Sequence, residues 1–329
     1  MTSTLQLALP GVVAAEPTVE WIWSEDTEEE ALVFVHATVM KDEILVALAP
    51  SQGGVYVDAT LGAGGHTEAI LESASGARVI AFDRDAKAIT AAKERLAPFG
   101  ERVTFVPQSF ANLRAALDSL GIRTVDGVCA DLGVSSPQLD DADRGMSFRR
   151  EGPIDMRMDQ DNGETALELI DRLSDEALAD VIFRYGDERR SRRIARSIKR
   201  ALGDQELHTT LDLRRAIVRA VGPVRVGGVD PATRTFQALR IAVNQELEEL
   251  DALLGALPDV LSPGGVAAIL SFHSLEDRLA KHAFQHRDLW TPLWKKPLVA
   301  SDEERGQNPR SRSAKLRAAR RMEDPEVPS

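Results

Sequence analysis

Short apolar runs alternate with amphipathic segments along two stretches of the chain. A short apolar run bounded by turn residues is typical of a buried strand, whereas apolar residues spaced three or four apart predict a helix. The first stretch predicts strands at 55–58, 78–82, 103–106 and 125–131 and helices at 40–48, 67–72, 86–96 and 110–120. This β-α repetition predicts a parallel sheet with right-handed crossover connections.

The repetition stops at Asp131 and resumes at Ala232. The polar segment between them predicts helices at 166–173, 176–185, 191–201 and 212–221, with Ser174 or Asp175 capping the second, and a linker at 224–231. The second stretch predicts one long helix at 232–257, a turn at 261–265, a strand at 266–271, a helix at 275–284 capped by Ser274, and a short strand at 315–319.

This pattern predicts a core that is divided in sequence. We expect an α/β core made of 34–140 and 231–329, with an inserted all-helical domain at 141–230 that recognises the substrate. Residues 1–33 are acidic and show no sustained period, so we expect that extension to be disordered.

A glycine turn joins the first predicted strand to its helix. Asp58 ends the strand, and Gly62, Gly64 and Gly65 follow. Glycine accepts positive φ and lets a ligand approach bare backbone, so the turn predicts a nucleotide cradle. Its Gly-x-Gly-Gly spacing differs from that of dinucleotide sites, and the preceding acid suits a cationic ligand without phosphate. S-adenosylmethionine fits that description, although a turn that only packs helix on strand is an open alternative.

Polar residues end the other predicted strands as well. Asp83 ends the second strand, where a carboxylate can accept both hydroxyls of a ribose. Phe110 lies just beyond the third strand, and Asp131 ends the fourth. Because ligands of parallel sheets bind past the carboxyl ends of the strands, we expect these residues and Asp58 to converge on one crevice.

Composition limits the class of protein. The chain has 329 residues, and no apolar run approaches the ~20 residues of a membrane span or a secretory signal. The single cysteine, Cys129, excludes a disulfide framework, and the histidines lack metal-ligand spacing. We therefore expect a cytoplasmic protein that uses no metal and no membrane. The net charge of −12 argues against a general nucleic-acid binder, but bases cluster at 189–200 and 305–321.

The loop after the fourth predicted strand suits methyl transfer to an exocyclic amine. Such an amine must present its lone pair, so acceptors have to hold its N–H groups. Ser135-Ser136-Pro137 offers a polar residue followed by a proline that fixes φ, and with Asp131 these residues are the catalytic candidates. No covalent nucleophile is needed, so Cys129 is interpreted as a core thiol. His273 can be catalytic, substrate-positioning or structural.

With these motifs in place, the chain resembles the small-subunit ribosomal RNA methyltransferase H family over about residues 36–320. The matching segments are His36–Val39, Gly62–His66, Asp83–Asp85, Asp131–Asp140, Arg144–Phe148, Gly152–Asp159, Tyr185–Arg189, Pro231–Gln237, Arg240–Glu248, Ser271–Arg278 and Asn308–Ser313. The strings Ser-Ser-Pro-Gln-Leu-Asp and Pro-Ala-Thr-Arg-Thr-Phe-Gln are the most distinctive of these.

The resemblance implies a Rossmann-like class I methyltransferase with a mostly parallel seven-stranded sheet. It also implies methylation of the N4 amine of one cytidine in the decoding region of 16S rRNA, on small ribosomal subunits, by direct in-line transfer. The family's S-adenosylmethionine contacts carry over to Gly64, Gly65, His66, Asp83, Phe110, Asp131 and Gln138. Alternatives are an amino-methyltransferase that acts on DNA and a subunit assembly factor without catalysis, and a homodimer is left open.

The basic clusters suggest where the substrate binds. RNA contacts are expected from exposed cations, since phosphates dominate nucleic-acid affinity. The candidate substrate-binding residues are Arg189, Arg192, Arg193, Arg196, His273, Arg310 and Arg312.

Overall fold

The computed structural model describes residues 38–50, 53–223 and 230–323. By its internal contacts the chain divides into 1–35 and His36–Ser329, and the fold below belongs to the second unit. The expected disorder of 1–33 falls outside the described residues, as does most of the predicted linker at 224–231.

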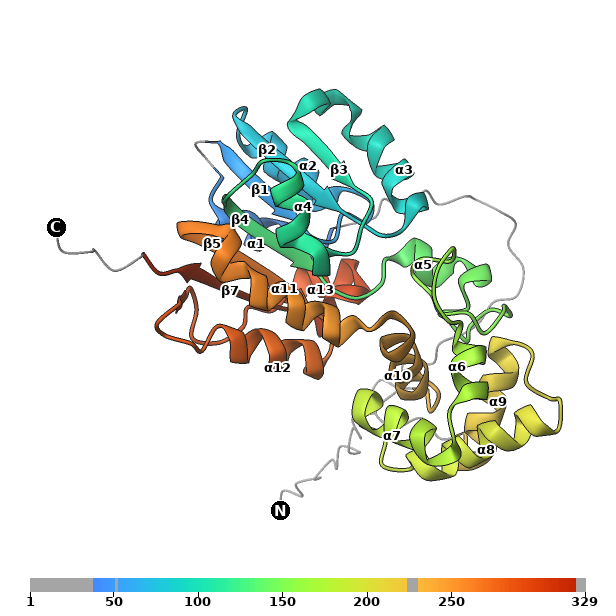
Figure 1. Cartoon of the computed structure of the whole chain (residues 1–329). Helices are drawn as coiled ribbons and strands as arrows, with labels where there is room; N and C mark the ends of the chain where they lie inside the picture. Colours follow the sequence, from blue (N-terminus) through green and yellow to red (C-terminus); the bar gives the residue numbers. More distant parts are fainter. Residues whose placement is uncertain (1–37, 51–52, 224–229, 324–329) are drawn as a thin grey trace, which may run out of the picture. The chain divides into compact units, whose positions relative to one another are not determined.

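One sheet of seven strands forms the centre of this unit, in the order β3-β2-β1-β4-β5-β7-β6 (Figure 1). The strands are β1 (Gly54–Asp58), β2 (Ala77–Phe82), β3 (Val103–Val106), β4 (Val125–Asp131), β5 (Leu261–Ser271), β6 (Trp290–Pro292) and β7 (Lys315–Arg321). β1 to β5 pair in parallel, and β7 runs antiparallel to β5 and β6. The predicted mostly parallel, seven-stranded α/β fold is confirmed.

The strand order creates a crevice beside β1. The chain runs outward from β1 through β2 to β3 and then returns to place β4 on the other side of β1. Connections therefore leave β1 and β4 in opposite directions, and their carboxyl ends stay open for a ligand.

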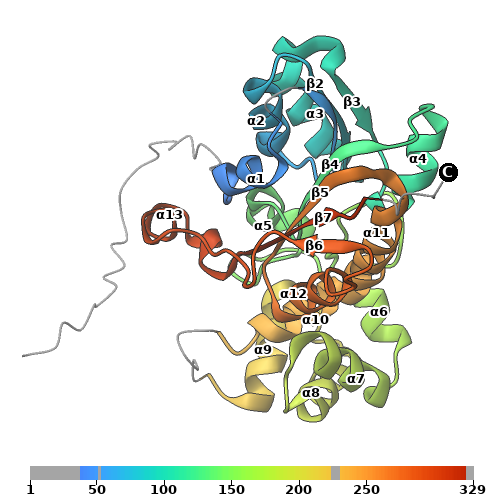
Figure 2. The same ribbon diagram turned by 90° about the vertical axis from the view of Figure 1, so that its left-hand side faces the viewer.

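Helices cover both faces of the sheet because successive strand residues point to opposite sides. Tyr56 and Val79 join one apolar core, whereas Val57 and Ile80 join the other. The first core is covered by α1 (Lys41–Leu48), α2 (Gly65–Ser73) and α3 (Ala86–Leu96). The second is covered by α4 (Leu113–Ser119), α11 (Glu246–Val260) and α12 (Ser274–Ala283). Figure 2 shows α1 and α2 on one side of the sheet and α4 and α11 on the other.

The segment between β4 and β5 is helical, with no strand of the sheet among its described residues. It contains α5 (Ser136–Asp140), α6 (Ala166–Arg172), α7 (Asp175–Gly186), α8 (Ser191–Gly203), α9 (Thr210–Val221) and α10 (Thr233–Asn244). The helices α6 to α10 enclose a third apolar core, to which Phe236 and Leu239 of α10 contribute. The prediction that 141–230 is a separate domain stays a prediction.

Four local predictions were wrong. The turn expected at 261–265 is part of β5, whose register against β4 shifts between Val125 and Gly127. The long helix at 232–257 is two helices, because Gln245 adopts the left-handed conformation with φ 51° between α10 and α11. The helix at 110–120 begins as a 3-10 turn, Phe110–Asn112. Ser274 does not cap α12, since His273 occupies the cap position and accepts from the Glu276 amide.

Smaller elements complete the chain. They are the 3-10 turns η1 (Ala97–Arg102), η3 (Ala142–Arg144) and η4 (Pro309–Ser313) and the short helix α13 (Asp302–Gln307). Over the described part of the chain, no helix combines the length and apolarity that crossing a membrane requires.

Candidate active site

A pocket lies at the carboxyl ends of the central strands and has two walls of different origin. The first wall consists of the lining residues between Thr38 and Gln138, including the glycine turn, Asp83, Phe110 and Asp131. The second wall consists of Met158, Glu246, Glu276 and Arg310.

Asp58 shapes the turn that opens the first wall. Its carboxylate is buried and accepts hydrogen bonds from the Thr60 amide at 3.1 Å and the Thr67 hydroxyl at 2.7 Å. Gly64 caps α2 with φ 82°, a conformation that favours glycine. At Gly65 a Cβ would come within 1.8 Å of the Thr38 hydroxyl, so a larger residue would force Thr38 to move. Gly65 lines the pocket, whereas Gly64 supports it from behind.

Asp83 fixes the same turn from the neighbouring strand. It accepts from the Gly62 amide at 2.9 Å and from the Asp85 amide at 2.8 Å. Burial raises the pKa of Asp83, and burial likewise raises the pKa of Asp58, above the usual aspartate value. Each carboxylate oxygen has further lone pairs, so Asp83 can still accept hydroxyl groups from a ligand in the pocket.

His66 and Asp131 have buried polar atoms in the pocket without hydrogen-bond partners in the described part of the chain. The His66 Nε2 lies 3.6 Å from an oxygen of Asp131, and the His66 side chain is 5% exposed. Both ring nitrogens of His66 and Oδ1 of Asp131 are buried without a hydrogen-bond partner among the residues that the structure describes. Unsatisfied buried polar groups are costly, so these atoms fit a polar ligand that would satisfy them.

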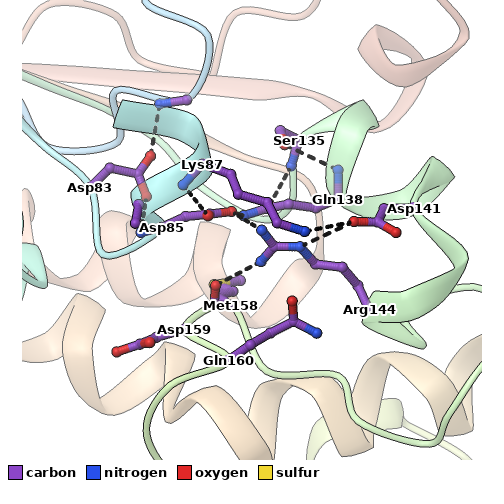
Figure 3. A network of polar contacts seen from close by, with 12 residues as sticks. Asp83, Asp85, Lys87, Ser135, Gln138, Asp141, Arg144, Met158, Asp159 and Gln160 are labelled. Atoms are coloured by element: carbon purple, nitrogen blue, oxygen red, sulfur yellow. Dashed lines mark hydrogen bonds and ion pairs between the residues drawn. The ribbon is translucent and has the colours of Figure 1, made fainter. Parts of the chain in front are cut away.

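Gln138 is held by the protein rather than pointing freely at a ligand (Figure 3). Its amide nitrogen donates to Asp85 at 3.0 Å, and its amide oxygen accepts from the Ser135 amide at 2.9 Å. Arg144 binds the same Asp85 carboxylate at 2.6 Å, and both side chains are buried. Arg144 also donates to the Met158 carbonyl at 2.8 Å, so it joins the first wall to the second.

The catalytic candidates lie where β4 passes into α5. Ser135 lines the pocket, and its carbonyl accepts from the Leu139 amide at 3.1 Å. Ser136 and Pro137 begin α5, but their side chains fall outside the described residues. Cys129 is buried within β4, and burial raises the pKa of its thiol well above the ordinary value, which agrees with a core thiol.

The second wall contains an ion-pair cluster that the sequence did not reveal. Arg240 donates to both oxygens of Glu246, at 2.7 and 2.9 Å. Glu276 accepts from the Phe272 amide at 2.8 Å and lies 3.2 Å from the His273 ring. The only local signal was the three-residue spacing of His273 and Glu276, which is that of a capping box. Glu246 carried no local signal at all.

The same cluster also has the composition of a metal site. Ligand atoms of Glu246, His273 and Glu276 all lie within 4.8 Å of one another. The carboxylates are already engaged by Arg240 and by backbone amides, and a guanidinium beside the site disfavours a cation. This arrangement is better explained as an ion-pair network, and the absence of a metal stays a prediction.

The structure separates the predicted substrate residues. Arg310 lines the pocket, whereas His273 caps α12 behind it. Arg312 is exposed and donates to the Arg305 carbonyl at 3.2 Å. The remaining four are exposed on or just before α8, and none of them lines the pocket: Arg189, Arg192, Arg193 and Arg196.

Similarity to known proteins extends over the residues of both walls. The sequence model of the MraW methylase family matches residues 33–322. Ribosomal RNA small subunit methyltransferase H of Sorangium cellulosum is 64% identical over 287 residues, 87% of this chain and 91% of that protein. The protein of the same name from Nostoc punctiforme is 47% identical over 294 residues, 89% of this chain and 96% of that protein. A solved rRNA methylase from Streptococcus thermophilus aligns with TM-score 0.41 and 11% identity, covering 86% and 94% of the two chains.

Proposed function

The chain belongs to the MraW methylase family, and from that premise we propose that it methylates the N4 amine of one cytidine in the decoding region of 16S rRNA. It is an rRNA methyltransferase whose cofactor is S-adenosylmethionine. We place the reaction in the cytoplasm, on assembled or nearly assembled small subunits.

The unpartnered polar atoms of the first wall support the cofactor assignment most directly. The pocket that contains the His66 nitrogens and the free oxygen of Asp131 also contains the Gly65 turn and Asp83. Asp83 would accept the ribose hydroxyls, and Asp131 and His66 would bind polar groups of the cofactor. The cofactor supplies an activated methyl group on a positively charged sulfur. The carboxylates of this wall favour that charge.

The protein's part in the reaction is to position the amine. Ser135 and the backbone around it lie at the pocket wall beside Asp131, where they can accept the N–H groups of an exocyclic amine. Holding the two reactants in line can contribute ~7–11 kcal/mol to lowering the barrier. No covalent intermediate is required, because the amine attacks the activated methyl group directly and the methylated amine then loses its proton to water.

Methyl transfer from labelled S-adenosylmethionine tests the proposal. The substrates are small subunits that lack the modification, protein-free 16S rRNA and duplex DNA, and labelled nucleosides are identified after digestion. We expect N4-methylcytidine from subunits. Label in DNA alone would replace the RNA assignment with a DNA amino-methyltransferase. Binding to subunits without any label would indicate an assembly factor.

Asp131→Asn provides the matched control for the assay. It keeps the shape of the side chain but removes the carboxylate charge, so transfer should fall while subunit binding is retained. Unchanged transfer would remove Asp131 from the proposed site.

A further inference from the structure

A second hollow lies at the edge of the sheet, away from the pocket described above. It is enclosed by the end of α12, the edge strand β6, the loop that follows β6, and part of β7. It shares no lining residue with the active-site pocket. Lys281, Arg287, Trp294, Lys295, Lys296 and Arg317 are among the residues around it. We call it the edge hollow.

The edge hollow is positively charged in an acidic protein. The segment 281–296 has four Lys or Arg residues and one acid, Asp288, whereas the whole chain carries a net charge of −12. Lys281, Arg287, Lys295 and Lys296 are exposed. None of the four has a hydrogen-bond or ion-pair partner among the described residues. By contrast, Arg317 is paired with Asp277 at 2.6 Å.

Helix electrostatics explain only part of this cluster. Lys281 lies in the last turn of α12, where a cation favours the helix dipole. Lys295 and Lys296 lie in a loop and have no such reason to gather beside Lys281 and Arg287. Like charges at close range repel, so their grouping favours an anionic ligand that bridges them.

An aromatic side chain lies among these cations. Trp294 is half-buried and packs against the first apolar core while it lines the edge hollow. Cations together with an accessible aromatic ring are the combination by which proteins bind single-stranded nucleic acid, since phosphates pair with the cations and a base stacks on the ring. An acidic protein surface would pair with the cations as well, but it has no nucleobase to stack on Trp294.

The chain itself connects the edge hollow to the active site. Arg310 lines the active-site pocket, and Arg317 of β7 lines the edge hollow seven residues later. Leu298, in the loop that follows β6, pairs with Leu316 of the same strand. The active-site pocket and the edge hollow are therefore linked through β7 and the loop that follows β6.

We propose that the edge hollow is a second RNA-contact site, which binds backbone phosphates near the target nucleotide and stacks an unpaired base on Trp294. The inference rests on the proposed rRNA substrate and adds a surface to it. Neither predicted basic cluster, 189–200 or 305–321, includes the four unpaired cations.

Charge reversal in the loop tests the phosphate contacts. The full-length Lys295→Glu/Lys296→Glu variant is compared with the wild type for binding to small subunits and to protein-free 16S rRNA across a salt series. We expect weaker binding to both, and a salt dependence of log K that is flatter by roughly 1 per lost phosphate contact. S-adenosylmethionine affinity should not change, which also shows that the variant is folded.

Arg78→Glu/Arg123→Glu is the matched control. These two arginines are exposed, and their side chains lack partners among the described residues. Arg78 is the second residue of β2 and Arg123 lies just before β4, so both are at the amino ends of their strands, opposite the pocket. The control makes the same change in net charge. If both variants show the same affinity and salt slope, the edge hollow does not bind RNA. Weaker binding to subunits with unchanged binding to protein-free rRNA would also overturn the proposal, because the partner would then be a ribosomal protein.

Trp294→Leu tests the stacking contact separately. Leucine keeps apolar packing against the core but cannot stack a base. RNA affinity should fall by about 5- to 150-fold, the effect of losing one stacked base, while the salt slope stays the same. Unchanged affinity in a folded variant would remove Trp294 from the site. If the wild type neither binds nor methylates subunits, the proposed function fails. If the wild type does both and the edge-hollow variants bind RNA as it does, only the proposed second RNA-contact site is refuted.

Discussion

The two walls of the active-site pocket handle charge in opposite ways. In the first wall, burial raises the pKa of Asp83, as it does that of Asp58, which lies just outside the lining. Asp131 and His66 keep polar atoms without hydrogen-bond partners among the described residues. In the second wall, Glu246 is paired with Arg240. Burial alone would raise the pKa of Glu276, but hydrogen bonds and charge from His273 hold it below the usual value. The first wall is thus left incomplete for a ligand, whereas the carboxylates of the second wall are engaged by protein groups.

This difference assigns ligand binding to the first wall and stabilisation of the fold to the second. A carboxylate whose pKa is raised costs stability at neutral pH, so a protein keeps it where function needs it. A paired carboxylate contributes to the fold instead. Arg144 connects the two walls, because it binds Asp85 at the N-cap of α3 and the carbonyl of Met158 in the second wall (Figure 3).

The largest effect is expected when this connection is removed. Arg144→Ala leaves Asp85 buried without its cation and should cost about 3–5 kcal/mol of unfolding free energy. Urea denaturation measures the loss. The control is Lys87→Ala, which breaks an exposed pair with Asp141 nearby and should cost no more than about 1 kcal/mol. Equal losses would mean that the walls are not held together at Arg144.

Acid should reduce the difference between wild type and Arg144→Ala. Burial raises the pKa of Asp85, but the bonds from Arg144 and Gln138 outweigh it and hold the pKa below the usual value. A depressed pKa stabilises the fold above the unfolded value of about 3.9, and this contribution is lost as pH falls through the folded pKa. The variant lacks that contribution. Denaturation at pH 7 and at pH 3 should therefore give a smaller gap at pH 3, and a constant gap would contradict the assignment.

Next in size is the loss of ligand binding in the first wall. Asp83→Ala removes charge-assisted hydrogen bonds to the ribose worth ~1.5–3 kcal/mol, so S-adenosylmethionine affinity should fall about 10- to 150-fold by calorimetry. Asp83→Asn retains one acceptor oxygen for the turn, so its affinity for S-adenosylmethionine should lie between those of the wild type and Asp83→Ala. An affinity equal to that of the wild type would mean that the second-strand acid is not a cofactor ligand.

A charge change in the second wall should lower the stability of the fold and leave cofactor affinity unchanged. Glu276→Gln keeps an oxygen for the Phe272 amide but loses the charged interaction with His273, so we expect a stability loss of about 1–3 kcal/mol. Cofactor affinity should stay within about twofold, since 0.4 kcal/mol lies within ordinary mutational scatter. A large loss of cofactor affinity without loss of stability would show that this wall also binds the cofactor.

The smallest expected effect lies outside both walls. Arg192→Glu/Arg193→Glu reverses two exposed charges on α8, which does not line the pocket. If α8 contacts RNA, subunit binding should weaken and its salt slope should flatten by roughly 1 per contact, while cofactor affinity is unaffected. Filter binding over a salt series measures this, and an unchanged slope would remove α8 from the substrate interface.

The sequence alone determined the glycine turn and the strand-end acids of the first wall. The strand, glycine turn and helix from Gly54 to Ser73 follow from local rules, since each residue type needed there is dictated by its neighbours in the chain. Asp83 and Asp131 were found because the ends of parallel strands must share one edge. The same periodicity placed β1 to β4 to within one residue and predicted the four helices α6 to α9, but it missed α5 and merged α10 with α11.

Only the tertiary structure decided the orientation of Gln138 in the first wall, the second wall and the edge hollow. Gln138 turns to Asp85 because of a partner 53 residues away, and the Met158 amide donates to Asn244, 86 residues further on. The break at Gln245 divides two helices that pack on different cores, which apolar spacing by itself could not show. Lys281 and Lys296 face one hollow because β6 brings the loop back beside α12. Contacts between distant segments depend on how elements pack, and packing leaves no periodic signal in the chain.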